Sequence, residues 1–158
     1  MIAFEYRLTS SGNAQATIRD GTEQAILYVS YRSDALRALT AAVNALLQGA
    51  KAAGCVWFAE PGEYRWSLTR RGDAVWIRVV GFKQWEQERS PKDRGRVLFK
   101  THCQLEDFAA TVLRELERLY TSLGPAGYKE RWVNHEFPVA EYKHLRDLTT
   151  GRTTKGSI

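Results

Sequence analysis

The sequence predicts an α+β fold made of an internally duplicated strand-strand-strand-helix unit. Two segments at a constant offset share one pattern of apolar, turn and small residues, and each is followed by a strand-like run and a helical stripe. The length of 158 residues suits a single domain. We expect the two units to form one antiparallel sheet with two long helices on one face and short helices at the C-terminus, which leaves the other face partly open.

The duplication is clearest between residues 4–14 and 64–74. In each copy alternating apolar residues run into a glycine-containing turn and back out, which is the pattern of a β-hairpin. The matching positions are Leu8, Thr9, Gly12 and Ala14 in the first copy, and Leu68, Thr69, Gly72 and Ala74 in the second. The tripeptide Arg71-Gly72-Asp73 looks like a cell-adhesion motif, but the first copy has Ser-Gly-Asn at this place. We therefore interpret the tripeptide as a turn.

Each hairpin is followed by a third strand and a helix. Residues 26–31 and 97–102 have strand composition, and the helical stripes after them end at Gly49 and at Gly124-Pro125. The stripes consist of Leu36, Leu39, Val43, Leu46 and Leu47, and of Leu105, Phe108, Val112, Leu116, Leu119 and Leu123. An extra strand at residues 55–58 is expected in the second copy.

These elements predict one domain over residues 1–148. It contains pseudo-repeats at residues 2–49 and 54–124 and a C-terminal helical segment at residues 125–148, and a flexible tail follows at residues 149–158. Pro138 suits the first turn of the last helix.

Composition indicates a soluble protein. The net charge is +5 and the pI is about 9.4, which permits an acidic partner or nucleic acid but does not require either. No apolar run is long enough for a membrane span, and the N-terminus lacks the pattern of a secretory signal. Two cysteines are too few for a disulfide framework. We expect a cytoplasmic protein that does not engage a membrane.

The sequence gives little support for catalysis. The candidate ligands and nucleophiles lack metal-site spacing, a nucleophile elbow or a phosphate loop, so we expect no metal, no cofactor and no catalytic residue. These candidates are Cys55, His102, Cys103, His135 and His144. Glu60 and Glu63 flank a Pro-Gly turn near Trp57 and Trp66, and an enzyme using them would need a pocket that contains both carboxylates.

Residues 74–82 carry apolar side chains at both odd and even positions, so either face of this strand could belong to the core. Two hairpin registers are therefore possible. A two-residue loop makes Leu68 face Val75 and Trp66 face Ile77, and places Trp76 and Arg78 on the other face beside Arg65. A three-residue loop reverses the faces. We favour the two-residue loop for the second copy and the three-residue loop for the first.

The second face and the polar segment at residues 83–96 hold the candidate binding residues. These are Arg65, Trp76, Arg78, Lys83, Trp85, Arg94 and Arg96. Tryptophan and arginine are enriched at protein interfaces, and aromatic residues in a basic groove also bind single-stranded nucleic acid. The structural alternative is that the C-terminal helices cover this face and that Trp76 belongs to the core.

Residues 30–36, 60–66, 128–132 and 137–138 together resemble a group of small uncharacterised bacterial proteins. The resemblance covers nearly the whole chain, carries no established catalytic residues and implies a bacterial, cytosolic protein. By analogy, proteins of this size and style are often of accessory or immunity type. The element order is also similar to that of the Whirly and PUR fold, which binds single-stranded nucleic acid, although the first copy is one strand short. We expect a non-enzymatic binding module for a protein partner. The alternative is single-stranded nucleic-acid binding through the basic aromatic face.

Overall fold

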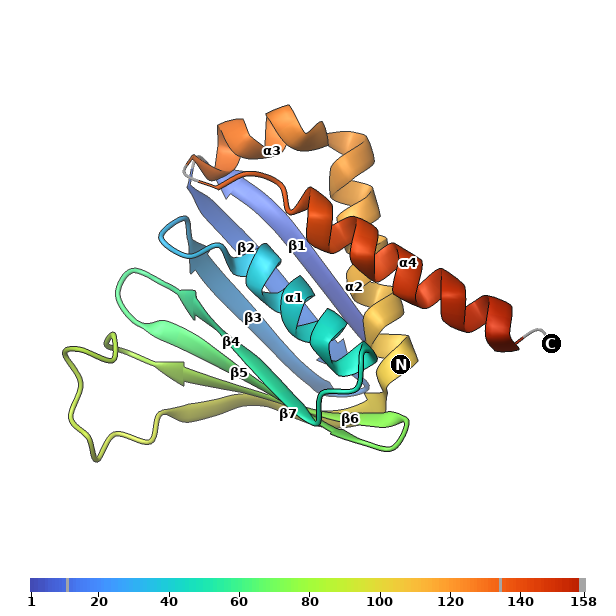
Figure 1. Cartoon of the computed structure of the whole chain (residues 1–158). Coiled ribbons are helices and arrows are strands. Elements are labelled where there is room, and N and C mark those ends of the chain that lie inside the picture. The colour runs from blue at the N-terminus through green and yellow to red at the C-terminus, as the bar shows by residue number, and fades with distance from the viewer. Residues whose placement is uncertain (11, 134, 157–158) are drawn as a thin grey trace.

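The computed structural model describes residues 1–10, 12–133 and 135–156. It has an α+β architecture with antiparallel strands, as the sequence predicts (Figure 1). The predicted single sheet is wrong, because the described strands form one sheet of three and one of four. The extra strand of the second copy is present and begins at Ala52.

The first copy forms a three-stranded sheet, called sheet A, from β1 (Ile2–Ser10), β2 (Asn13–Asp20) and β3 (Glu23–Ser30). Residues at alternate positions are buried, so one face belongs to the core. Tyr6 pairs with Ala16 and Phe4 with Ile18. The pairing shifts between Leu8 and Ser10, so the hairpin combines a tight turn with a local irregularity rather than the expected three-residue loop.

The second copy forms sheet B from β4 (Ala52–Phe58), β5 (Glu63–Arg71), β6 (Ala74–Phe82) and β7 (Arg96–Gln104). The turn after β5 has the expected two residues, and Gly72 has φ +61°, a conformation that favours glycine. The observed pairs are Leu68 with Ile77 and Trp66 with Val79. They lie two positions from the predicted pairs, which preserves the predicted faces because side chains alternate.

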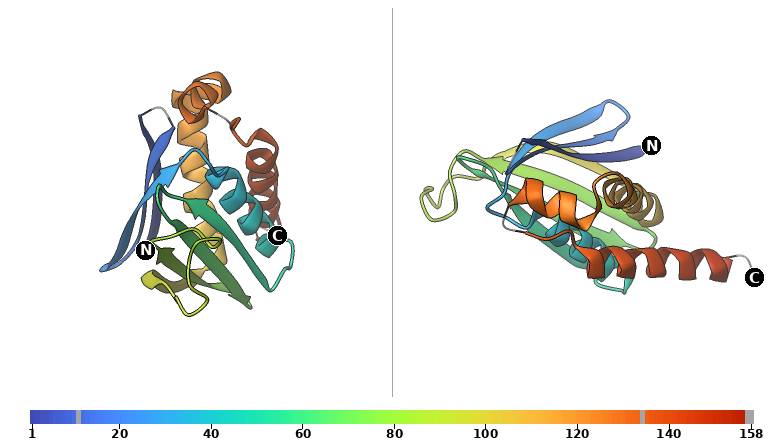
Figure 2. Two further views of the ribbon diagram at one scale, coloured as in Figure 1. Left: turned by 90° about the vertical axis from the view of Figure 1, so that its left-hand side faces the viewer. Right: turned by 90° about the horizontal axis from the view of Figure 1, so that it is seen from above.

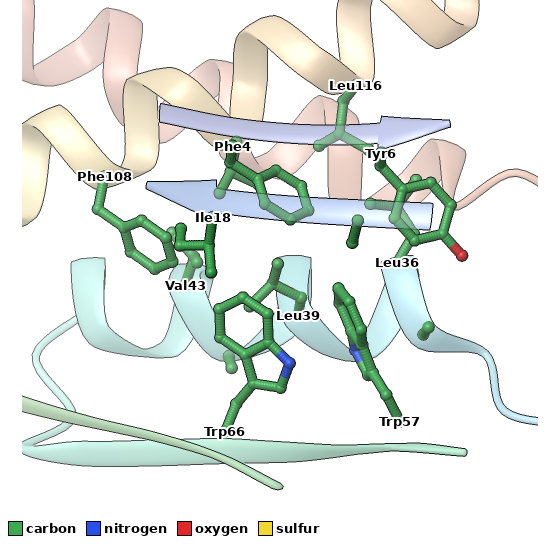
Figure 3. Close-up of a cluster of buried hydrophobic side chains, with 14 of the residues drawn as sticks. Phe4, Tyr6, Ile18, Leu36, Leu39, Val43, Trp57, Trp66, Phe108 and Leu116 are labelled. Carbon is green, nitrogen blue, oxygen red and sulfur yellow. The ribbon is translucent and has the colours of Figure 1, made fainter. Parts of the chain in front are cut away.

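The helices that follow the two copies join the sheets crosswise. Helix α1 (Ala35–Leu47) follows sheet A but packs on β4 of sheet B, and α2 (Leu105–Ser122) follows sheet B but packs on β1 of sheet A. Figure 3 shows aromatic side chains of both sheets meeting around α1. The centroids of the Trp57 and Trp66 rings lie 4.9 Å apart, and Phe4 and Tyr6 contact them edge-on. The sheets thus share one core without merging into one sheet.

The C-terminal segment packs on helices and on sheet A, where the centroids of the Tyr6 and Trp132 rings lie 6.0 Å apart. Helix α3 (Gly124–Trp132) buries Tyr128 and Trp132, and α4 (Val139–Gly156) packs on α1 and α2. The prediction of short C-terminal helices is wrong for α4, which has 18 residues and continues past Leu148, where the sequence predicts the end of the domain. The last two residues of the predicted tail, 157–158, lie outside the described residues. None of the described helices is both long and apolar enough to cross a bilayer.

Helix α2 also protects the edge of β1. The backbone N–H of Phe4 donates to Thr111 Oγ1 over 3.0 Å, and that of Tyr6 donates to the buried carboxylate of Glu115. Arg118 donates to the Tyr6 carbonyl and pairs with Glu115. Side chains therefore satisfy backbone groups that an added strand would otherwise use, and this edge is closed to strand addition.

Candidate functional site

The outer face of sheet B, on the side opposite the core, is open at its middle and near the β5–β6 turn, whereas the segment 83–95 covers the end that carries Glu63. It is formed by Arg65, Ser67, Thr69, Trp76, Arg78, Val80, Lys100 and His102. In the left view of Figure 2 the described helices lie above sheet B, and the sheet closes the lower side of the molecule. Trp76 on this face is only partly buried. Helix α4 packs on α1 and α2, on the other side of the sheet. The C-terminal helices therefore do not cover this face.

Three neighbouring strands place the side chains of Arg71, Trp76 and His102 in one row, called the Trp76 stack. The rings of Trp76 and His102 lie 5.0 Å apart at an interplanar angle of 17°. The Arg71 guanidinium carbon lies 4.8 Å from the centroid of the Trp76 ring. These contacts combine aromatic stacking with a cation–π interaction and restrict the position of the indole.

Positive charge is concentrated in this part of the chain. Residues 63–104 hold ten Lys and Arg against five Asp and Glu, an excess equal to the net charge of +5 of the whole protein. Arg78 and Lys100 are directly opposite each other on β6 and β7, and both are exposed. Neither forms an ion pair within the described residues. Like charges at opposed strand positions repel, so the free sheet carries an unfavourable pair here.

The predicted candidates separate into groups in the structure. Trp76 lies near the β5–β6 turn at one end of the outer face, and Arg78 lies at its centre. Arg65 and Trp85 lie at the other end, where the segment 83–95 returns to the sheet (Figure 1). Lys83, Arg94 and Arg96 are exposed in that segment and at the start of β7.

Sequence reasoning missed Arg71, Lys100 and His102 as members of the face. Arg71 is part of the tripeptide interpreted as a turn, and the sequence presents His102 only as a potential metal ligand. Lys100 and His102 can be recognised as members of the face only from the pairing of β6 with β7, which places them opposite Arg78 and Trp76.

Glu63 anchors the segment 83–95. Its side chain is 1% exposed and receives the Nε of Arg65 over 2.7 Å and the backbone N–H of Glu86 over 2.8 Å. Arg89 reaches the same carboxylate over 3.3 Å, and its guanidinium lies 3.7 Å from the centroid of the Phe82 ring. A buried carboxylate is tolerated here because three donors satisfy it.

A pocket of about 430 Å³ lies between this anchor and β4, and we call it the Trp85 pocket. Its lining includes Arg32, Val56, Phe58, Arg65, Trp85 and Glu86, with Glu63 at the inner end. The Arg32 guanidinium lies 5.1 Å from the centroid of the Trp85 ring. The indole N–H of Trp85 donates to the Ala59 carbonyl over 3.2 Å and fixes the ring.

Glu60 and Glu63 do not share a pocket. Glu60 pairs with Arg32 over 2.7 Å and lines a separate, polar pocket of about 450 Å³ with Tyr28 and Tyr64. Both oxygens of Glu63 are engaged by Arg65, Arg89 and the Glu86 amide. The paired-carboxylate arrangement that general acid–base catalysis needs is therefore not formed by these two residues.

The described residues contain no cluster of three or more His, Cys, Asp or Glu side chains placed to hold a metal ion. The thiols are poorly suited to nucleophilic chemistry. Burial raises the pKa of Cys55 to about 12. Burial, with further contributions from Asp20 and Asp107, raises the pKa of Cys103 to about 11. The thiolate is the reactive form, so both groups are protonated at neutral pH.

We expect both thiols to react slowly with 5,5′-dithiobis(2-nitrobenzoate) in the folded protein. At pH 8 a pKa near 11 leaves about one thiol in a thousand ionised, against roughly a quarter at an ordinary pKa of 8.5. Absorbance at 412 nm should show modification roughly 100-fold slower than in protein unfolded in guanidinium chloride. A folded-state thiol that reacts as fast as in the unfolded chain would contradict this and restore a cysteine nucleophile as a candidate.

Comparison of the chain with family models, with curated proteins and with solved structures finds no match.

Proposed function

We propose that this chain is a non-enzymatic binding protein whose partner is a protein that presents an acidic surface to the outer face of sheet B. The observation that carries the proposal is the exposed, unneutralised Arg78–Lys100 pair beside the Trp76 stack. An accessory or immunity-type role fits this mode of action, because an inhibitor needs only to cover its target.

Repulsion between Arg78 and Lys100 supports an anionic partner. A carboxylate placed between two exposed cations gains attraction to both and relieves their mutual repulsion, which raises affinity and speeds association. Trp76 adds a large apolar surface that is already held in place by Arg71 and His102, so little side-chain entropy is lost when a partner covers it. Ordered tryptophan and arginine side chains are the residues that most often dominate protein interfaces.

Occupancy of the Trp76 ring favours a protein over single-stranded nucleic acid. A base would stack on the face of an aromatic ring. His102 on β7 stacks against Trp76 at 17°, and Arg71 on β5 lies over the same ring, so neighbours from both adjacent strands already use its faces. A protein partner can instead contact the exposed ring edge and the surrounding cations. Single-stranded nucleic acid remains the second candidate because the basic charge and two aromatic rings share one sheet face.

The test compares two double variants with equal changes in charge. Arg78→Glu with Lys100→Glu alters the outer face of sheet B, and Arg7→Glu with Arg19→Glu alters exposed positions on the corresponding face of sheet A. A partner is isolated from a lysate of the source organism with wild-type protein, purified, and titrated by calorimetry. We expect the sheet B variant to bind about 100-fold more weakly and the sheet A variant to bind within about threefold of wild type.

Two results would contradict the proposal. One is equal loss of affinity in both variants, which would assign the effect to net charge. The other is submicromolar binding of a labelled single-stranded 20-mer with an affinity that falls steeply between 50 and 200 mM salt, which would establish the nucleic-acid alternative.

A further inference from the structure

We infer that the Trp85 pocket binds an aromatic ring that carries a carboxylate. In the partner this group is an aromatic side chain next to an acidic residue or a C-terminal carboxylate. The identity of the occupant rests on the proposed function, whereas the pocket and its chemistry stand on the contacts described above.

The pocket has an apolar floor suited to a flat ring. Val56 and Phe58 on β4 and Trp85 on the returning segment are each partly exposed there. The Phe58 and Trp85 rings lie 6.1 Å apart at an interplanar angle of 37°, so they form two adjoining walls. The volume of about 430 Å³ lies within the range of small-ligand sites and is ample for a two-ring aromatic group.

The polar groups around this floor favour an anion. Within the described residues, Nη1 and Nη2 of Arg32 and Nη1 of Arg65 donate no hydrogen bond, whereas both oxygens of Glu63 are engaged. Glu86 is 70% exposed at the rim and already binds Arg65 over 2.8 Å. The guanidinium nitrogens with no bonded acceptor therefore outnumber the carboxylate oxygens with no bonded donor. A planar guanidinium group can bind a carboxylate through two parallel hydrogen bonds.

Rigid support makes the pocket a preformed site. The indole N–H of Trp85 is held by the Ala59 carbonyl, and the Glu86 amide is held by the buried Glu63. The pocket lies on the same face as the Trp76 stack, because Arg65 and Arg71 are on one strand and project to the same side. Six residues of extended chain separate them, which is about 20 Å. One partner can therefore occupy both ends of the face.

The test uses 2-naphthoate as the probe and 2-naphthylmethylamine as a cation with the same ring system. Binding is followed through the indole N–H resonances of the five tryptophans in nitrogen-15 spectra, with the Trp85 signal assigned through Trp85→Phe. We expect the Trp85 signal to shift saturably with a Kd of about 1 mM for naphthoate, at least about tenfold tighter than for the amine. The Trp76 signal should stay unchanged and serves as the internal control.

Three variants sharpen the result. Arg32→Gln should weaken naphthoate about fivefold or more without affecting the amine, because it removes charge-assisted donors and keeps the bulk. Trp85→Ala should abolish binding, with folding verified by circular dichroism. Arg19→Gln alters an exposed position on sheet A, outside the pocket, and should bind as wild type. Equal or tighter binding of the amine, shifts centred on Trp76, or no saturable shift up to about 20 mM naphthoate would overturn the inference.

Failure of the pocket and failure of the proposed function are distinguishable. If the Arg78 and Lys100 reversals abolish partner binding but naphthoate does not bind, the inference is overturned and the proposed function stands. If naphthoate binds with the expected preference but the reversals leave partner binding unchanged, the pocket is supported and the basic-face proposal is overturned.

Discussion

Glu63→Ala is expected to lower the free energy of unfolding by about 3–5 kcal/mol, because removal of one partner leaves buried charges uncompensated. The Arg89 guanidinium is 11% exposed and would lose the Glu63 carboxylate, and the Glu86 amide would lose its acceptor. We expect the segment 83–95 to separate from the sheet as a result. Urea unfolding followed by tryptophan fluorescence measures the first effect, and hydrogen exchange across the segment measures the second.

The matched control is Glu86→Gln, which alters the other carboxylate bound to Arg65. Its side chain is 70% exposed, so loss of this ion pair should change stability by less than about 1 kcal/mol. A Glu63→Ala protein that unfolds within about 1 kcal/mol of wild type, with unchanged exchange over residues 83–95, would show that Glu63 does not anchor the segment.

The separation into strands, helices and faces could largely be predicted from the sequence. The side chains predicted for the core face, Trp66, Leu68, Val75 and Ile77, are buried, and Arg78 is exposed. The alternation of apolar residues along a strand decides which side chains share a face of the sheet. A shift of the pairing by two residues leaves every side chain on the same face. This is why the predicted cross-strand pairs were wrong although the faces were right.

The number of sheets could not be predicted, because one sheet or two leaves the alternation along each strand the same. The helical stripe of α1 shows which of its sides is buried, but not that this side meets β4 of the following copy. The crosswise packing depends on contacts between residues far apart in sequence, such as Tyr6 with Trp57. A local pattern does not record such contacts.

The candidate site was only partly predictable for a related reason. The positions of Trp76 and Arg78 on the outer face can be predicted from the alternation of side chains within one hairpin. Lys100 and His102 join them only through the pairing of β6 with β7, and the long segment between these strands does not set a register. A pairing shift at Val79 and Val80 adds a further offset. In the sequence Glu63 resembles half of a catalytic pair, and its role as an anchor depends on Arg89, which reaches it from the middle of that segment.

Trp66→Ala is expected to lower the free energy of unfolding by about 3–5 kcal/mol, the usual effect of removing a large buried aromatic side chain. Trp66 is 2% exposed, and its ring contacts Phe4 of sheet A and Trp57 of sheet B, so the substitution opens a cavity where the two sheets meet. Trp76→Ala is the matched control, since it removes the same side chain from the opposite face of the same sheet.

The control should change stability by no more than about 1.5 kcal/mol, because Trp76 is partly exposed and loses mainly its contacts with Arg71 and His102. The two variants should also differ in the cause of any lost binding. Trp76→Ala should lose affinity for the partner while it remains folded at 37 °C. Similar unfolding free energies for both variants would place Trp76 in the core and remove the basis for an open binding face. A large difference, with affinity lost only in the stable variant, assigns one tryptophan to the fold and the other to recognition.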